Sequence, residues 1–161
     1  MIKLIVIVPL IALLIVLLIN ELISSLWLDN TIKNRFLNNK ELFETTRQIC
    51  LKEKIGFIGD SENPNLENQV YNMISGYYVY ADEALSDDIQ KELKGMLTKL
   101  KRYRFHSIYV NDNRIAFAAS NFFKSIMLVY TEENESVESI IKSSFCREAR
   151  YIDDNWYITV D

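Results

Sequence analysis

The sequence predicts an α+β protein with an N-terminal transmembrane helix, followed by about three amphipathic helices packed on a 4–5-stranded antiparallel sheet. Residues 4–19 carry no polar side chain. From there to about residue 104 apolar residues recur at helical spacing, and from Phe105 onward the period changes to two. Because the helices precede the strands instead of alternating with them, the pattern is typical of the α+β class.

Length and composition indicate one domain beside the apolar segment. Removing residues 1–28 from the 161-residue chain leaves residues 29–161, which are enough to bury an independent core. Hydrophobic residues make up 49% of the chain and aromatic residues 12%, which argues against disorder. We therefore assign residues 1–28 to a transmembrane anchor with a short flank, and residues 29–161 to a globular domain.

The charge balance argues against a nucleic-acid partner. Acidic side chains number 22 and basic ones 18, giving a net charge of −4. Proteins that bind polyanions usually carry a basic face. Nucleic acid is therefore not expected among the partners.

The apolar run from Leu4 to Ile19 predicts a membrane span. Each Leu, Ile or Val in it favours insertion by about 0.3–0.6 kcal/mol at the helix centre. As a helix the run extends roughly 24 Å, slightly short of a bilayer core. Pro9 lies in the second turn, where it removes little hydrogen bonding, and Trp27 suits the headgroup level. The expected contact with the lipid bilayer covers residues 4–27.

A cleaved signal peptide and a buried core helix are the alternatives to this anchor. A cleavage site needs small residues at positions −3 and −1, yet Ile23 precedes Ser25 and Leu22 precedes Ser24 at that spacing. An uncleaved signal-anchor is therefore favoured. Lys3 in the short N-terminal flank favours a cytoplasmic N-terminus and an exported domain, as in a single-pass protein of the cell (inner) membrane.

Three amphipathic helices are predicted after the anchor. The first covers residues 29–54, and its apolar face is formed by Ile32, Phe36, Phe43 and Cys50. After a loop at residues 56–65, helical spacing of apolar residues predicts the second helix over residues 66–77. The third runs from about Ser86 to Tyr103, with Asp87 and Gln90 as an N-terminal capping box.

An aromatic cluster, Tyr77, Tyr78 and Tyr80, follows Gly76. One interpretation is a recognition surface. The other, which is favoured, is a helix end whose rings cover the core while their hydroxyls reach solvent.

Strands dominate the last third of the chain. Residues 105–110 and 114–118 flank an Asn-Asp-Asn turn and predict a hairpin. Residues 124–131 are nearly continuous in apolar character and predict a central strand. After a short helical turn near residues 137–141, residues 145–152 and 156–160 predict a closing hairpin.

The two cysteines, Cys50 and Cys146, have no metal-type spacing, and His106 is the sole histidine. No metal and no cofactor are therefore expected. If the domain is exported, the pair suggests a disulfide that would stabilise the fold by about 4 kcal/mol. In a reducing compartment the two would instead be buried thiols acting as small apolar groups.

The residues give little support for catalysis. His106 lies in a predicted strand, and no glycine-rich phosphate loop is present. A pair formed by His106 and one of the cysteines stays open as a nucleophilic alternative. No enzymatic activity is expected.

One resemblance concerns the last third of the chain. The strand Ser125–Tyr130 and the stretch Tyr151-Ile152-Asp153-Asp154-Asn155-Trp156-Tyr157 resemble the ending of small single-span bacterial envelope proteins, an uncharacterised family. The resemblance implies a membrane-tethered α+β domain and no activity. The general plan is also similar to that of type IV pilins, but this chain lacks their Gly-Phe cleavage junction and the glutamate within the apolar run.

These observations predict a membrane-anchored, non-catalytic binding module of the cell envelope. Its expected partner is another envelope protein, with the chain acting as an accessory subunit or an immunity-type protein. The alternative is a membrane-tethered enzyme with a pocket around His106. The two differ in a testable way, because catalysis requires His106, a cysteine or several carboxylates to converge in a hollow.

Overall fold

The structure is a computed structural model that describes residues 2–63, 66, 69–111, 114–120, 125–132, 136–144 and 146–160; the side chains of residues 2–10, 21–22, 24–27, 29 and 143–144 lie outside this description. The helices and strands are α1 (Ile2–Asn38), α2 (Lys40–Lys52), β1 (Ile55–Gly59), β2 (Val70–Ile74), β3 (Tyr77–Ala81), α3 (Asp87–Arg102), β4 (Phe105–Asn111), β5 (Arg114–Ser120), β6 (Ser125–Thr131), α4 (Val137–Ser144), β7 (Glu148–Asp153) and β8 (Trp156–Val160).

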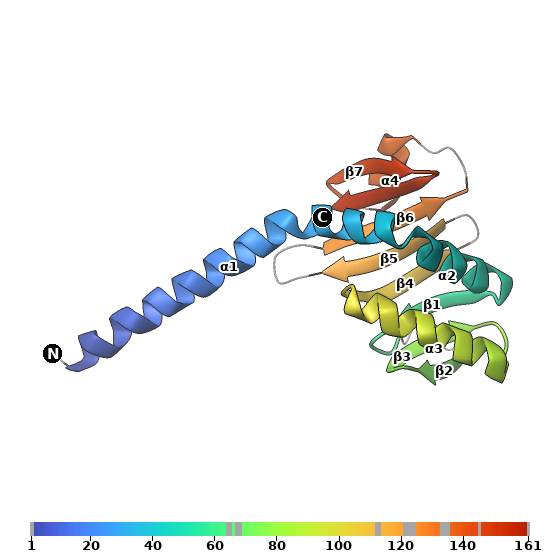
Figure 1. Cartoon of the computed structure of the whole chain (residues 1–161), viewed down its shortest axis with the longest axis horizontal. Helices are drawn as coiled ribbons and strands as arrows, with labels where there is room; N and C mark the ends of the chain where they lie inside the picture. The colour runs from blue at the N-terminus through green and yellow to red at the C-terminus, as the bar shows by residue number, and fades with distance from the viewer. Residues whose placement is uncertain are drawn as a thin grey trace.

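The strands form one antiparallel sheet in the order β2-β3-β1-β4-β5-β6-β8-β7. Figure 1 shows α2, α3 and the C-terminal part of α1 lying across one face of this sheet, while the rest of α1 projects away from it. The α+β class is therefore confirmed. The expected number of 4–5 strands is wrong, because the sheet has eight.

The main core lies between the sheet and the helices. Phe43 of α2 is fully buried at its centre, with ring centroids 5.2–6.3 Å from the rings of Phe36, Phe105, Phe117 and Trp156. Leu28, Ile32 and Phe36 at the end of α1 belong to the same core. A second, smaller cluster, formed by Ile140, Cys146, Ala149 and Tyr157, joins α4 to the end of the sheet.

Several predicted elements are confirmed. The helix after the apolar run is present, broken at Asn39 into the end of α1 and α2. The third helix is α3, although its N-cap is Ser86, whose Oγ accepts a hydrogen bond from the Ile89 backbone N–H. The hairpin β4–β5, the strand β6 and the closing hairpin β7–β8 lie where the period-two pattern places them.

The region between α2 and α3 is where the secondary-structure prediction fails. The predicted helix over residues 66–77 is instead β2 and the start of β3, joined by the two-residue turn Ser75-Gly76, and the predicted loop contains β1. Val70, Met73 and Ile74 fit helical spacing only because both faces of β2 are apolar. In β2 and β3 the β-branched and aromatic residues favour extended structure. Pairing with neighbouring strands then decides for a strand over a helix.

The predicted anchor is corrected by the structure. Within the part of the chain that is described, no helix combines the length and apolar character needed to cross a membrane. Asn20 and Glu21 interrupt the apolar run, and Leu28 beyond them packs into the core. This finding contradicts the transmembrane helix at residues 1–28 and the single-pass inner-membrane location derived from it.

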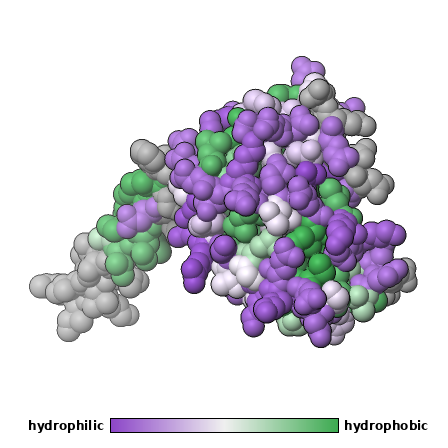
Figure 2. All heavy atoms as spheres, turned by 45° about the vertical axis from the view of Figure 1, so that its right-hand side comes forward, coloured by the Kyte–Doolittle hydropathy of each residue, from purple (hydrophilic) through white to green (hydrophobic). Residues whose placement is uncertain are grey.

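Of the four residues proposed to mark the anchor, Leu4, Pro9 and Trp27 lie outside the described side chains. The fourth, Ile19, is about half exposed, and so are the large apolar residues between Ile11 and Leu18. Figure 2 shows this hydrophobic stretch of α1 standing apart from a domain surface that is mostly hydrophilic in this view.

The predicted disulfide is also wrong. Cys50 and Cys146 are both free and buried. Cys50 lies in the main core and Cys146 in the small cluster. Trp156 and Tyr157, neighbours on β8, contribute to the main core and the small cluster respectively. Because successive strand residues point to opposite faces, the two thiols lie on opposite sides of the sheet.

Candidate functional site

The sheet face that α1, α2 and α3 leave uncovered carries a row of aromatic side chains, which we call the aromatic row. It crosses four neighbouring strands at one end of the sheet and consists of Tyr71 on β2, Tyr78 and Tyr80 on β3, Phe57 on β1 and Tyr109 on β4. Tyr77, by contrast, points to the helix side, where its hydroxyl donates a hydrogen bond to the backbone oxygen of Phe105 at 2.7 Å.

The rings of the aromatic row contact one another in sequence. The Tyr71 ring lies 6.1 Å from that of Tyr78 and 5.9 Å from that of Tyr80. The Phe57 ring lies 5.9 Å from that of Tyr80 and 5.2 Å from that of Tyr109. These centroid separations fall in the range of favourable aromatic pairs. The row is therefore one connected aromatic surface built from three separate chain segments.

The two ends of the row are open, whereas its middle is covered. Tyr71 is 59% exposed and Tyr109 47% exposed, while Phe57 and Tyr80 are buried. The Tyr80 hydroxyl accepts a hydrogen bond from the backbone N–H of Asn63 at 3.1 Å, which places the segment after β1 beside the row. The exposed rings of Tyr71 and Tyr109 thus pack against the buried rings of Tyr80 and Phe57, which hold them in place.

A carboxylate accompanies the row. The negative charge of Glu62 is the main cause of a raised pKa of the Tyr78 hydroxyl, to which Glu62 is also hydrogen bonded. On the helix side, burial raises the pKa of Tyr77 to about 12, with a smaller contribution from the charge of Asp60. The aromatic row therefore has the carboxylate of Glu62 beside Tyr78.

Gly59 allows the Phe57 ring to lie flat on the sheet. A Cβ added at Gly59 would lie 2.3 Å from the Phe57 Cζ, so any larger residue must displace this ring. Neighbours on both sides hold the ring, since Tyr80 and Tyr109 contact it.

We expect Gly59→Ala to destabilise the protein by about 1–3 kcal/mol, because the added methyl overpacks the base of the aromatic row. Equilibrium unfolding in urea measures the change. Gly95→Ala is the matched control: its Cβ would meet nothing within 4 Å, and the position is an exposed helix interior in α3. There alanine should stabilise by about 0.5–1 kcal/mol. Equal effects at the two glycines would contradict the close packing.

His106 does not meet either cysteine. Its Nδ1 lies 3.0 Å from the Ser107 Oγ and its Nε2 3.1 Å from the Ser120 Oγ. Cys50 and Cys146 belong to the two hydrophobic clusters described above, and burial raises the pKa of the Cys50 thiol to about 12. Three hollows on the described surface, two of them of about 460 Å³, are lined by residues other than His106.

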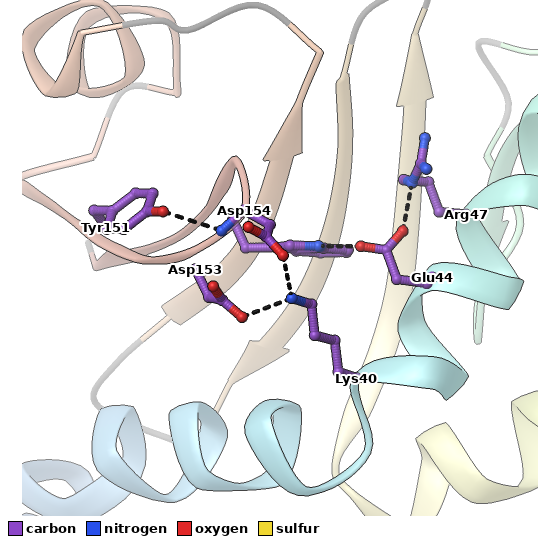
Figure 3. A network of polar contacts seen from close by, with 7 residues as sticks. Lys40, Glu44, Arg47, Tyr151, Asp153 and Asp154 are labelled. Atoms are coloured by element: carbon purple, nitrogen blue, oxygen red, sulfur yellow. Dashed lines mark hydrogen bonds and ion pairs between the residues drawn. The ribbon is translucent and has the colours of Figure 1, made fainter.

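A polar network ties α2 to the closing hairpin. The Lys40 ammonium donates to one carboxylate oxygen each of Asp153 and Asp154, both at 2.6 Å, and these bonds raise the pKa of Lys40. One turn further along α2, Glu44 accepts a hydrogen bond from the Trp156 indole Nε1 at 2.7 Å and pairs with Arg47. Figure 3 shows these side chains converging from α2 and the β7–β8 turn. The network fixes the closing hairpin against α2.

Metal binding has no support in the described residues, where no group of three or more His, Cys, Asp or Glu side chains could hold an ion. The aromatic row was visible in the sequence only in part. Tyr78 and Tyr80 belong to the predicted cluster, whereas Tyr71, Phe57 and Tyr109 join them through strand pairing that no local pattern reveals. No family model, no curated protein and no solved structure matches the chain.

Proposed function

We propose that the chain is a non-catalytic module that binds another protein, and that the aromatic row is its binding surface. The observation that carries this proposal is the connected set of rings with exposed ends at Tyr71 and Tyr109. Tyrosine is enriched at protein interfaces because it offers a large contact area at a low cost in conformational entropy. The buried base of the row lowers this cost further, since the exposed rings are already held in place.

The aromatic rings and the carboxylate of Glu62 favour a partner segment with basic side chains. Lysine and arginine are attracted to the faces of aromatic rings, and Glu62 beside Tyr78 adds a carboxylate for a salt bridge. The net charge of −4 acts in the same direction at longer range. With neighbouring strands about 4.8 Å apart, the row extends roughly 14 Å from β2 to β4. An extended segment of about four to five residues would reach from the exposed ring of Tyr71 to that of Tyr109.

The test uses a displayed library of random twelve-residue peptides as the probe. Peptides are selected on the intact chain after depletion on the double variant Tyr71→Ala/Tyr109→Ala. We expect the selected peptides to be rich in Arg and Lys and to lose at least ten-fold in affinity with either single variant. Calorimetric titration of synthetic peptides measures the loss. Glu62→Gln should also weaken binding, and the loss of affinity relative to the intact chain should be larger at low salt than at high salt.

The matched control is Tyr151→Ala. Tyr151 lies on the same side of the sheet, at the opposite end, and is 58% exposed. Its replacement should leave the affinity unchanged. Failure to select any peptide that prefers the intact chain to the double variant would contradict the proposal, and so would an equal loss in Tyr151→Ala.

A further inference from the structure

The two edges of the sheet differ in chemistry. The edge strand β7 carries Glu148, Arg150 and Asp153, and its pairing with β8 is interrupted by a bulge at Tyr151–Asp153. Charged side chains and bulges are the usual devices that prevent a sheet edge from pairing with another chain. This edge is therefore protected.

The opposite edge strand, β2, has none of these devices. Its sequence is Val-Tyr-Asn-Met-Ile, without a charge or a proline, and it pairs with β3 in regular register. Among the described residues, β3 is its only pairing partner. Val70, Tyr71 and Met73 are exposed, Met73 by 55%. An uncharged, regular and apolar edge is suited to receive a further strand.

The turn between β2 and β3 determines which backbone groups point outward. Ser75 and Gly76 both have positive φ, 54° and 79°, as in the two-residue type I′ turn. In such a turn the residues on either side, Ile74 and Tyr77, form a hydrogen-bonded pair. Hydrogen-bonded and non-hydrogen-bonded pairs alternate along an antiparallel ladder. The N–H and C=O groups of Tyr71 and Met73 therefore point away from β3.

We propose that two copies of this chain associate by antiparallel pairing of their β2 strands about a two-fold axis at Asn72. In this register Tyr71 lies opposite Met73 of the second copy, and each such pair exchanges both of its backbone hydrogen bonds. The result is one continuous sheet with eight strands from each copy. It also brings the two aromatic rows side by side.

The composition of β2 favours a second copy over an unrelated strand. In a two-fold interface the same patch meets itself, so the patch must be self-complementary. Because β2 is uncharged, pairing with β2 of a second copy brings no like charges together. Tyr71 opposite Met73 gives a contact between sulfur and an aromatic ring in both halves of the interface.

Asn72 gives the second argument for this register. Among the described residues its buried Nδ2 has no hydrogen-bond partner. At the axis the two Asn72 side chains form a non-hydrogen-bonded pair, the kind in which facing side chains lie closest. After a rotation of the carboxamide, each Nδ2 donates to the Oδ1 of the other copy. The symmetry thus supplies the missing acceptor.

Cysteine crosslinking of the purified full-length chain tests the proposal. In the proposed register the two Cα atoms at position 72 are about 4.5 Å apart, within the range of a disulfide. Oxidised Asn72→Cys should give at least ten-fold more crosslinked dimer on non-reducing gels than Tyr151→Cys on the protected edge. Val70→Cys is the register control, because Val70 faces Ile74 of the second copy and should not crosslink to itself.

A second substitution, at Met73, distinguishes crosslinking that depends on β2 pairing from crosslinking by random collision. Met73→Lys should abolish the crosslink of Asn72→Cys, because it places a charge in the paired edge. Met73→Pro should do the same, because it removes an outward N–H while it leaves the hydrogen bonds to β3 intact. Circular dichroism and the unfolding midpoint check that these variants still fold. A crosslink that survives Met73→Lys would overturn the proposal. A yield for Asn72→Cys equal to that of Val70→Cys or Tyr151→Cys would overturn it as well.

Discussion

Replacement of Trp156 by alanine is expected to destabilise the fold by about 3–5 kcal/mol. Trp156 is fully buried at the start of β8, and its ring contacts those of Phe36, Phe117 and Tyr130 at 4.9, 5.8 and 5.3 Å. Alanine would leave a large cavity where the end of α1, α2 and the closing hairpin meet. It would also remove the donor to Glu44 and leave that carboxylate without its indole partner.

Urea unfolding followed by circular dichroism at pH 7 measures this loss, and Trp156→Phe separates its two causes. Phenylalanine keeps most of the buried volume and removes the indole N–H, so its cost should be about 1–3 kcal/mol, the range for the loss of one hydrogen bond to a charged, half-buried partner. If Trp156→Phe were as harmful as Trp156→Ala, cavity formation would not be the dominant cause. If Trp156→Ala cost less than about 1 kcal/mol, the central position of Trp156 in the core would be contradicted.

Cys50 is expected to react with a thiol reagent about a thousand-fold more slowly in the folded chain than in urea. Burial raises its pKa from 9.0 to about 12, and only the thiolate attacks iodoacetamide. At pH 8 a rise of about three pKa units lowers the thiolate fraction by roughly three powers of ten. The rate should keep rising about ten-fold per pH unit up to pH 11, since the pKa lies above this range.

The measurement uses Cys146→Ser, so that Cys50 is the only thiol, and mass spectrometry follows the labelled fraction. The reciprocal variant, Cys50→Ala, reports Cys146, which is slightly more accessible at 7% exposure and should react faster. Rapid labelling of Cys50 at pH 8 without urea would show that α2 does not stay closed over the core. A plateau of the rate near pH 9 would contradict the raised pKa.

The sequence predicts those elements in which local pattern and tertiary role agree. In α3 a single face is apolar, and in β5 Ile115, Phe117 and Ala119 of the main core alternate with the small residues Ala116 and Ala118 on the other face. The hairpins β4–β5 and β7–β8 also have turn residues that mark their ends. For these segments, periodicity and turn chemistry are sufficient.

Prediction fails where local pattern is ambiguous or where pairing is non-local. In β2 both faces are apolar, so helical and extended periods fit equally well. β1 contains two glycines and becomes a strand because β3 and β4 enclose it. The aromatic row needs this same pairing, which is why only Tyr78 and Tyr80 could be singled out. The disulfide failed because spacing along the chain does not tell on which side of a sheet a cysteine lies.

The length of α1 has a mechanical consequence. The helix continues without a break from Ile2 to Asn38, and its last turns are locked into the core by Leu28, Ile32 and Phe36. The exposed apolar stretch from Ile11 to Ile19 therefore has a fixed angular phase with respect to the sheet. One residue inserted between Asn20 and Leu28 would rotate this stretch by about 100° and advance it by about 1.5 Å. An unbroken helix thus fixes the orientation of this stretch relative to the sheet, whereas a flexible linker would leave that orientation free.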